Sequence, residues 1–226
     1  IQNALLEAKK RGVRVREVVD ADIEGENYYS DTKKLIALLG NVRTDQETDL
    51  RTKKYYDNST KKKFDFTGDL MHDKFFVIDG RYVWTGSANI SDTCVGGYNA
   101  NIVGIIDSEE IAGWYTQEFE LMYGGQFHRD KGHSGVPGYH CTEKGDLCAY
   151  FSPHGWAIKN AVVPAIDSAK KSLDIAMFYL TDREVAAKII MAHQRGVKIR
   201  IIMDATGVRN KYSQWKILKD AGIPVK

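Results

Sequence analysis

The chain has 226 residues, of which 43% are apolar and 27% are charged, and its formal net charge at pH 7 is +2. These values are ordinary for a globular protein with a core of its own. No uninterrupted apolar stretch is long enough to cross a bilayer, and a net charge so near zero does not by itself indicate a polyanionic partner.

Helical and strand patterns alternate along the chain. A helix ending near Lys10 leads to a strand over residues 13–19, and a second helix is expected over residues 33–39. Further on, a strand over residues 100–106 precedes apolar residues at helical spacing over residues 111–122, a stripe that we interpret as core. This alternation predicts an α/β fold.

Two lysine clusters interleaved with aromatic residues follow the second expected helix. The cations are Lys53, Lys54, Lys61, Lys62 and Lys63. Such a loop is suited to holding a phosphate backbone while its aromatic rings stack on bases. It is also suited to lying against anionic headgroups at a membrane surface. The alternative is a solvated, lysine-rich hairpin.

Immediately afterwards, His72 and Lys74 stand two residues apart at the start of a run rich in Phe, Val and Ile. Side chains at i and i+2 share one face of a strand, so the imidazole and the ammonium are expected to point the same way, with Asp73 opposite. An imidazole titrates near neutrality and can act as a nucleophile or proton carrier at phosphorus. Lys74 adds positive charge for the phosphoryl oxygens.

A turn and a return strand complete this motif. Asp79 and Gly80 form a turn signal, and residues 82–85 are expected to return to Gly86 and Ser87. Glycine allows the backbone to approach a ligand closely, and the Ser87 hydroxyl and the Asn89 amide are neutral donors for an oxyanion.

At these residues the chain resembles the phospholipase D superfamily. The signature of that superfamily is His-x-Lys, four residues, Asp, six residues, then Gly-Ser and a nearby Asn. Every position of the signature is matched here, between His72 and Asn89. The competing interpretation is an amphipathic hairpin with a structural histidine.

The resemblance implies a mixed β-sheet flanked by helices and a reaction that uses neither metal nor cofactor. One histidine attacks phosphorus to form a phosphohistidine, and a second, from another copy of the motif, protonates the leaving group and later activates water or an alcohol. By the same resemblance the catalytic residues are His72, Lys74 and Asp79. Asp79 would support the other two without contacting the phosphate itself. The phosphate-binding residues would be Lys74, Ser87 and Asn89, backed by Gly86, Asn99 and Asn101. Cys94 has no part in this chemistry and is interpreted as structural.

Residues 124–149 are rich in glycine and are expected to connect two repeats. This region and its border hold His128, His133, His140, His154, Cys141 and Cys148. A Cys141–Cys148 disulfide is the favoured interpretation, and it would indicate a periplasmic or extracellular location. A zinc site and free thiols are the alternatives, although the spacing matches no standard zinc pattern.

A repeat is visible on either side of this connector. Residues 4–20 and 187–204 are each a helix, an Arg-Gly stop and a β-branched strand ending in Asp, and Gly12 and Gly196 are 184 positions apart. We therefore expect two tandem repeats, over residues 1–123 and 150–226. Both are expected to be incomplete, the first without its opening strand and helix and the second without its His-x-Lys. The chain is thus interpreted as part of a larger protein, or as a split subunit that takes its second motif from another chain.

Two enzyme classes share this chemistry and differ in substrate. The His-Asp-Lys form of the motif and the lysine and tyrosine loop favour an endonuclease-like phosphodiesterase by resemblance to bacterial phospholipase D-like endonucleases. The alternative is a phospholipase D or a phosphatidyltransferase, similar to cardiolipin synthase, that acts on phospholipids. A binding or scaffold protein that has lost catalysis is a third interpretation, since only one His-x-Lys is present.

Overall fold

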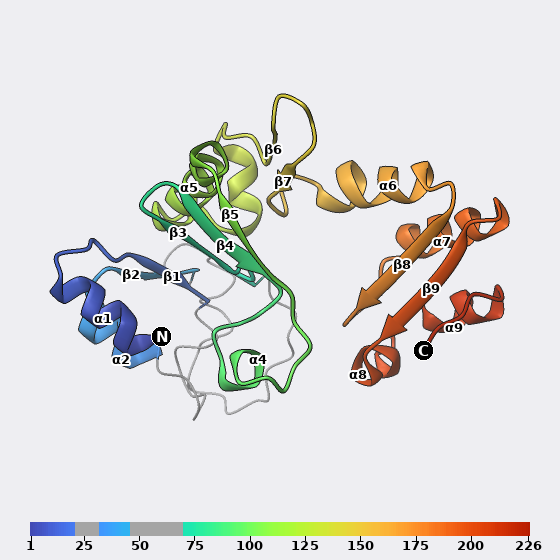
Figure 1. Cartoon of the computed structure of the whole chain (residues 1–226), viewed down its shortest axis with the longest axis horizontal. Helices are drawn as coiled ribbons and strands as arrows, with labels where there is room; N and C mark the ends of the chain where they lie inside the picture. Colours follow the sequence, from blue (N-terminus) through green and yellow to red (C-terminus); the bar gives the residue numbers. More distant parts are fainter. Residues whose placement is uncertain (21–31, 46–69) are drawn as a thin grey trace. The chain divides into compact units, whose positions relative to one another are not determined.

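The computed structural model describes residues 1–20, 32–45 and 70–226. They form two compact units, Ile1–Ala149 and Tyr150–Lys226, which are described separately (Figure 1). The lysine clusters at residues 53–63 lie outside the described residues. No helix in the described ranges is both long and apolar enough to span a membrane.

The first unit opens with two helix–strand pairs. These are α1 (Gln2–Lys10), β1 (Glu17–Val19), α2 (Thr32–Leu39) and β2 (Val42–Thr44), with β1 and β2 parallel. The strand expected over residues 13–19 is therefore shorter than predicted. Its pairing with β2 starts at Glu17, opposite Val42, so only its last three residues form a ladder.

The centre of the first unit is an antiparallel sheet of β3 (Phe75–Ile78), β4 (Tyr82–Gly86) and β5 (Val103–Asp107), in that order. Phe76 lies opposite Trp84, which in turn lies opposite Ile105. Between β4 and β5 the chain forms the short helix α4 (Asp92–Val95). The helix α5 (Glu109–Tyr123) packs on the sheet, with the ring of Phe75 centred 5.1 Å from that of Tyr115.

The sequence explains where α5 begins and which side it buries. The Ser108 hydroxyl accepts the backbone N–H of Ile111 and so caps the helix. Ile111, Trp114 and Met122 are buried, as expected of a core stripe. The chain then forms the 3₁₀ segment η3 (His128–His133) and the strands β6 (Tyr139–Cys141) and β7 (Cys148–Tyr150), which the Cys141–Cys148 disulfide joins. The disulfide prediction is confirmed, and the expected connector, residues 124–149, lies entirely within the first unit.

The second unit has a core of its own around two parallel strands. Its elements are η4 (Ile158–Val162, a π-helical turn), α6 (Val163–Ser168), β8 (Ser172–Met177), α7 (Arg183–Gln194), β9 (Lys198–Met203), α8 (Ala205–Arg209) and α9 (Trp215–Asp220). Alternate residues of β9, namely Ile199, Ile201 and Met203, are buried. They pack with Ile189 of α7 and Leu218 of α9.

The same backbone pattern ends α1 and α7. Gly12 has φ +87° and Gly196 has φ +88°. The N–H of Gly12 donates to the Lys9 carbonyl, and the N–H of Gly196 donates to the His193 carbonyl. Val13 and Val197 likewise donate to Ala8 and Ala192. Each residue of one set is 184 positions from its counterpart in the other.

A candidate phosphoryl-transfer site

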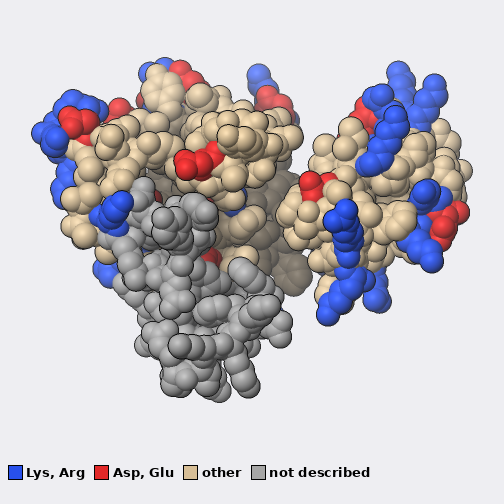
Figure 2. Space-filling view, turned by 90° about the horizontal axis from the view of Figure 1, so that it is seen from below, with Lys and Arg blue, Asp and Glu red and all other residues tan. Residues whose placement is uncertain are grey.

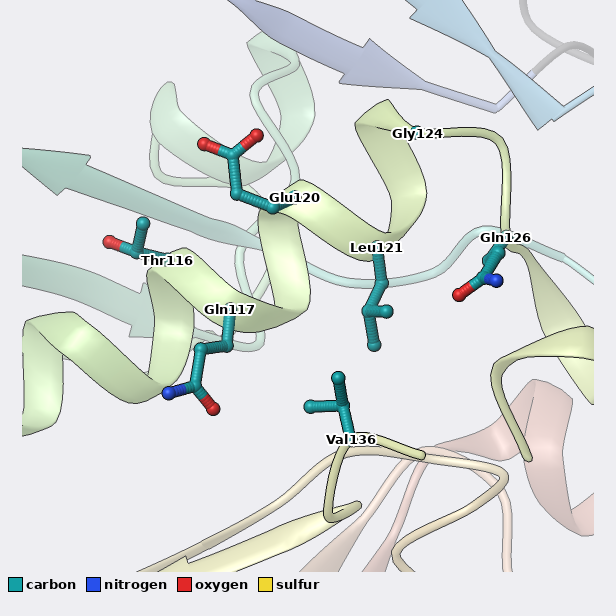
Figure 3. Close-up of a pocket in the computed structure, with 7 residues that line it drawn as sticks. All are labelled: Thr116, Gln117, Glu120, Leu121, Gly124, Gln126 and Val136. Carbon is teal, nitrogen blue, oxygen red and sulfur yellow. The ribbon is translucent and has the colours of Figure 1, made fainter. Parts of the chain in front are cut away.

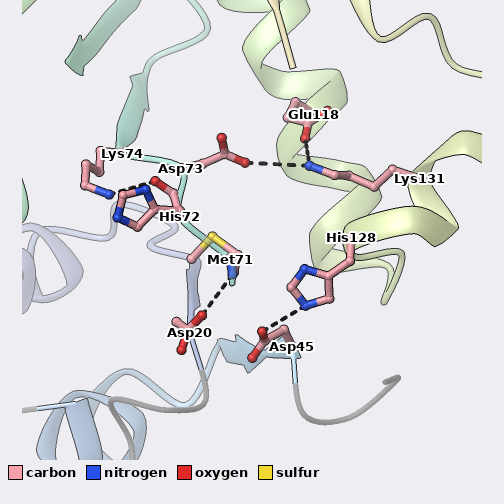
Figure 4. A network of polar contacts seen from close by, with 9 residues as sticks. All are labelled: Asp20, Asp45, Met71, His72, Asp73, Lys74, Glu118, His128 and Lys131. Atoms are coloured by element: carbon pink, nitrogen blue, oxygen red, sulfur yellow. Dashed lines mark hydrogen bonds and ion pairs between the residues drawn. The ribbon is translucent and has the colours of Figure 1, made fainter. Parts of the chain in front are cut away.

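His72 and Lys74 lie in an extended segment that leads into β3, rather than inside the strand as expected. The ladder with β4 starts only at Phe75, opposite Thr85. The segment is held by other bonds, since the N–H of Met71 donates to Asp20 Oδ2 (2.8 Å) and the Thr85 hydroxyl donates to the Lys74 carbonyl (3.1 Å). The alternation of side chains survives: His72 and Lys74 lie on one side, and Asp73 points the other way (Figure 4).

The surroundings of His72 favour its neutral form. Partial burial lowers the pKa of His72, and the nearby Lys74 ammonium lowers it further, whereas Asp73 acts in the opposite direction. A neutral imidazole has the free lone pair that a nucleophile needs. Burial also lowers the pKa of Lys74, against the charges of Asp73, Cys94 and Asp20. Its ammonium donates to the His72 carbonyl (2.7 Å), which keeps it beside the ring.

Asp79 is not brought to His72. It lies at the far end of β3, in the turn to β4, where Asp79 (φ +53°) and Gly80 (φ +63°) both have left-handed backbone. At about 3.3 Å per residue along a strand, this turn is roughly 16 Å from Lys74. Asp79 is exposed there. The turn prediction is confirmed, and the structure places Asp79 in this turn rather than next to the imidazole.

Ser87 is exposed, and its hydrogen bonds go to the two residues just before β5. Its hydroxyl donates to Asn101 Oδ1 (3.0 Å) and accepts the N–H of Ile102 (3.0 Å), and its own N–H donates to the Ile102 carbonyl (2.9 Å). Gly86 makes this pairing possible, because a Cβ there would overlap the Ile102 carbonyl oxygen. The Ser87 hydroxyl therefore fixes the loop that carries Asn89, whose side chain is exposed.

Cys94, interpreted from sequence as structural, lies within this constellation. The Asn99 amide donates to Cys94 Sγ (3.5 Å), and Asn101 Nδ2 donates to the Asn99 carbonyl (3.3 Å). The pKa of Cys94 is lowered to about 7, chiefly by the hydrogen bond from Ser91 and also by bonds from Asn99, Asn89 and Asn101. Asn99 and Asn101 thus support the loop after the motif, and do so partly through this thiol.

A buried polar network, which sequence reasoning missed, lies behind the motif. Lys131 of η3 donates to Glu118 of α5 (2.6 Å) and lies 3.7 Å from Asp73. His128 and Asp45, both buried, are 3.1 Å apart. An isolated lysine or histidine in a glycine-rich stretch gives no signal of burial, and these partners are far apart in sequence.

The histidines and cysteines around the connector do not converge on one site. Cys141 and Cys148 are oxidised to the disulfide, and the ring of His140 stacks on that of Trp114 with centroids 5.6 Å apart. His154 belongs to the second unit. Among residues 1–20, 32–45 and 70–226, no group of three or more His, Cys, Asp or Glu is arranged to hold a metal ion.

A hollow of about 400 Å³ lies elsewhere on α5. Its walls are Thr116, Gln117, Glu120, Leu121, Gly124, Gln126 and Val136, with the side chains of Leu121 and Val136 facing one another (Figure 3). No residue of the His72–Asn89 motif lines it, so the motif forms its site on a different part of the unit.

The antiparallel hairpin carries side chains suited to binding phosphate. A match to a family model agrees with this arrangement. A family model described as "Cardiolipin synthase, PLD-like domain" matches residues 1–123 and 162–226. The chain belongs to this phospholipase D-like family. This membership supports an enzyme of the phosphodiesterase type.

Curated relatives match over part of their length. The human mitochondrial cardiolipin hydrolase is 30% identical over 40% of this chain and 36% of its own, and the Drosophila melanogaster protein of the same name is 43% identical over 29% and 26%. A phospholipase D of Rickettsia prowazekii is 28% identical over 36% and 40%. The chain therefore spans well under half the length of these relatives.

Two solved structures are similar to this chain to different extents. NucT from Helicobacter pylori is 32% identical over 31% of this chain and 45% of its own, with a TM-score of 0.28. Polyphosphate kinase from Porphyromonas gingivalis covers 100% of this chain with 33% of its own, at 15% identity and a TM-score of 0.52. The second likeness concerns the fold alone.

Proposed function

We propose that the protein cleaves or transfers phosphodiesters with His72 as the nucleophile. The observation that carries the proposal is the placement of His72 and Lys74 on one side of the segment before β3 (Figure 4), with the pKa of His72 lowered by burial and by Lys74. A neutral ring nitrogen next to an ammonium is suited to attack a phosphorus whose oxygens the ammonium stabilises.

The reaction proceeds in two balanced steps. A His72 ring nitrogen forms a bond to phosphorus while the bond from phosphorus to the leaving oxygen breaks, and an acid protonates that oxygen. Water or an alcohol then attacks the phosphohistidine, gives up its proton to the same group and releases His72. Lys74 and Asn89 hold the phosphoryl oxygens, and Ser87 keeps the Asn89 loop in place through its bonds to Asn101 and Ile102.

The acid is a second histidine. The sequence contains a single His-x-Lys, so the partner group is supplied by a second copy of the motif outside these 226 residues, in the same protein or in another chain. We therefore expect this chain alone to turn over slowly. Rapid turnover by a monomer of these 226 residues would contradict the two-histidine scheme.

The favoured substrate is a nucleic acid. Residues 150–226 contain 13 Lys and Arg against 6 Asp and Glu, whereas residues 1–149 contain 19 against 24. Basic side chains are prominent over the second unit in Figure 2. A basic unit attracts a polyanionic backbone by neutralising its phosphates. The lysine clusters at residues 53–63 would add to this attraction.

A phospholipid is the second candidate. The observation in its favour is the description of the family and of several relatives, which are named for cardiolipin. Basic residues also attract anionic headgroups, so the charge of the second unit does not separate the two substrates. The Cys141–Cys148 disulfide favours an oxidising compartment, periplasmic or extracellular, for either activity.

One experiment separates these substrates. The protein from its complete coding sequence is incubated in chelator with plasmid DNA, with single-stranded RNA and with cardiolipin vesicles. We expect cleavage of nucleic acid, and a loss of at least about 10³-fold in His72→Ala. The control is His133→Ala, because His133 is exposed in η3. Cleavage of cardiolipin alone would favour the second candidate, and cleavage of no substrate would favour a binding protein.

A further inference from the structure

Lys131 is a buried cation in a segment that the motif does not include. Its side chain is 5% exposed, and its ammonium lies between the carboxylates of Glu118 (2.6 Å) and Asp73 (3.7 Å), as Figure 4 shows. Burial of an ammonium is costly unless partners compensate for the lost water. The pair with Glu118 meets this need, and the contact with Asp73 connects the pair to the motif.

Asp73 stands between His72 and Lys74 in the sequence, so peptide bonds join it to both residues. The segment around it is not part of a strand ladder. It is held instead at three points: the Met71 N–H on Asp20, the Lys74 carbonyl under the Thr85 hydroxyl, and the Asp73 carboxylate near Lys131. The first two bonds fix the backbone on either side of Asp73. The third fixes its side chain and therefore the rotation that sends His72 and Lys74 to the other side.

Lys131 also balances charge. Its single ammonium lies near two carboxylates. Burial raises the pKa of Glu118, whereas the positive charge of Lys131 lowers it. Asp73 in turn acts on His72 through its negative charge. The charged groups from the surrounding elements are Asp20 after β1, Asp73 and Lys74 beside the ring, Cys94 of α4, Glu118 of α5 and Lys131 of η3.

We infer that Lys131 is a positioning residue for His72 and Lys74, so that η3 contributes this one buried side chain to the apparatus of the site. Lys131 does not touch the substrate; it acts through Asp73. The inference rests on the proposed function for its meaning, but its geometry can be tested without turnover.

The test measures the pKa of His72 by NMR titration of the imidazole in this chain. The main variant is Lys131→Met combined with Glu118→Gln, because it removes both charges of the buried pair and leaves Asp73 without its counter-ion. We expect a higher pKa of His72 and shifted amide resonances for residues 71–74. Asp73→Asn should change the pKa of His72 in the opposite direction. Lys131→Arg, which keeps the charge, should stay closer to the wild type than Lys131→Met.

The control is Lys144→Met, since Lys144 is an exposed lysine between β6 and β7 and should leave His72 unchanged. A folded double variant with the wild-type pKa of His72 and unchanged amide resonances would overturn the inference. If the Lys131 variants do not fold, the test uses Asp73→Asn. Asp73 is partly exposed, and the substitution leaves no unpaired carboxylate buried at that position. An unchanged pKa of His72 in this variant would count against the inference. A shifted His72 in a protein that cleaves no phosphodiester would contradict the proposed function but support the position of Lys131.

Discussion

The thiol of Cys94 lies among hydrogen-bond donors from the loop that follows the motif. Bonds from Ser91, Asn99 and neighbouring groups favour the thiolate, and they hold the pKa of Cys94 at about 7, below the ordinary thiol value. A lowered pKa means that the thiol loses its proton at a lower pH. About half of Cys94 should therefore be thiolate near neutral pH. Its reactivity should then rise over a lower pH range than that of a free cysteine.

We therefore predict that iodoacetamide labels Cys94 with a midpoint near pH 7, as followed by mass spectrometry across a pH series. Asn99→Ala removes the donor at 3.5 Å and should raise the midpoint. The urea-unfolded chain provides the control, with a midpoint of about 8.5. A native midpoint equal to that of the unfolded chain would show that these bonds do not stabilise the thiolate.

Single residues also show how far the sequence determines the site. The i, i+2 rule places His72 and Lys74 on one side, because backbone alternation is a local property. Glu118 and Lys131 could not be placed from sequence, since their pairing depends on how α5 and η3 pack. Ser87 is expected to bind phosphate, and the structure adds that its hydroxyl donates to Asn101 just beyond the β4–β5 ladder. Sequence therefore identifies the chemistry, and packing determines which of these groups remain available.

At the scale of elements, Gly86 controls how β4 and β5 meet. A Cβ at Gly86 would overlap the Ile102 carbonyl oxygen and lie 2.9 Å from Val103 Cα. Gly104 follows Val103 in β5, and a Cβ at Gly104 would meet only the Thr85 carbonyl oxygen, at 3.9 Å. The two glycines thus form a matched pair within the same two strands.

We predict that Gly86→Ala destabilises the first unit by at least about 2 kcal/mol, because backbone atoms must separate to admit the methyl group. Gly104→Ala should change stability by less than about 1 kcal/mol. Urea unfolding followed by tryptophan fluorescence measures both. Equal effects of the two substitutions would mean that close approach at Gly86 is unimportant.

The predicted elements succeed where a pattern is long or a turn is specific. The helix over residues 111–122 and the turn at Asp79–Gly80 follow from local patterns, and both are present. The strand predicted over residues 13–19 is longer than the observed one. β-branched residues favour an extended backbone, but a strand ladder also needs a partner, and pairing with β2 begins only at Glu17. Element identity was therefore readable from sequence, but the extent of pairing was not.

At the scale of the whole molecule, the two units share a helix–glycine–strand device. Gly12 and Gly196 have nearly the same φ, and the residues around them make equivalent backbone bonds 184 positions apart. The parallel pairing that follows is similar as well: Glu17 N–H donates to the Asn41 carbonyl, and Ile201 N–H donates to the Pro224 carbonyl. We infer from this correspondence that the units are repeats of one design.

If the units are repeats with separate cores, the same substitution should act in each without affecting the other. A Cβ at Gly12 or Gly196 meets no atom within 4 Å, so Gly12→Ala and Gly196→Ala test backbone strain alone. Each should cost about 1–2 kcal/mol, the usual penalty for a left-handed L-residue, and Gly→Asn should cost less at both positions. Hydrogen exchange of the two units, read separately by NMR, should show Gly12→Ala lowering protection only in residues 1–149 and Gly196→Ala only in residues 150–226. Loss of protection in both units from either substitution would show that the chain unfolds as one cooperative body.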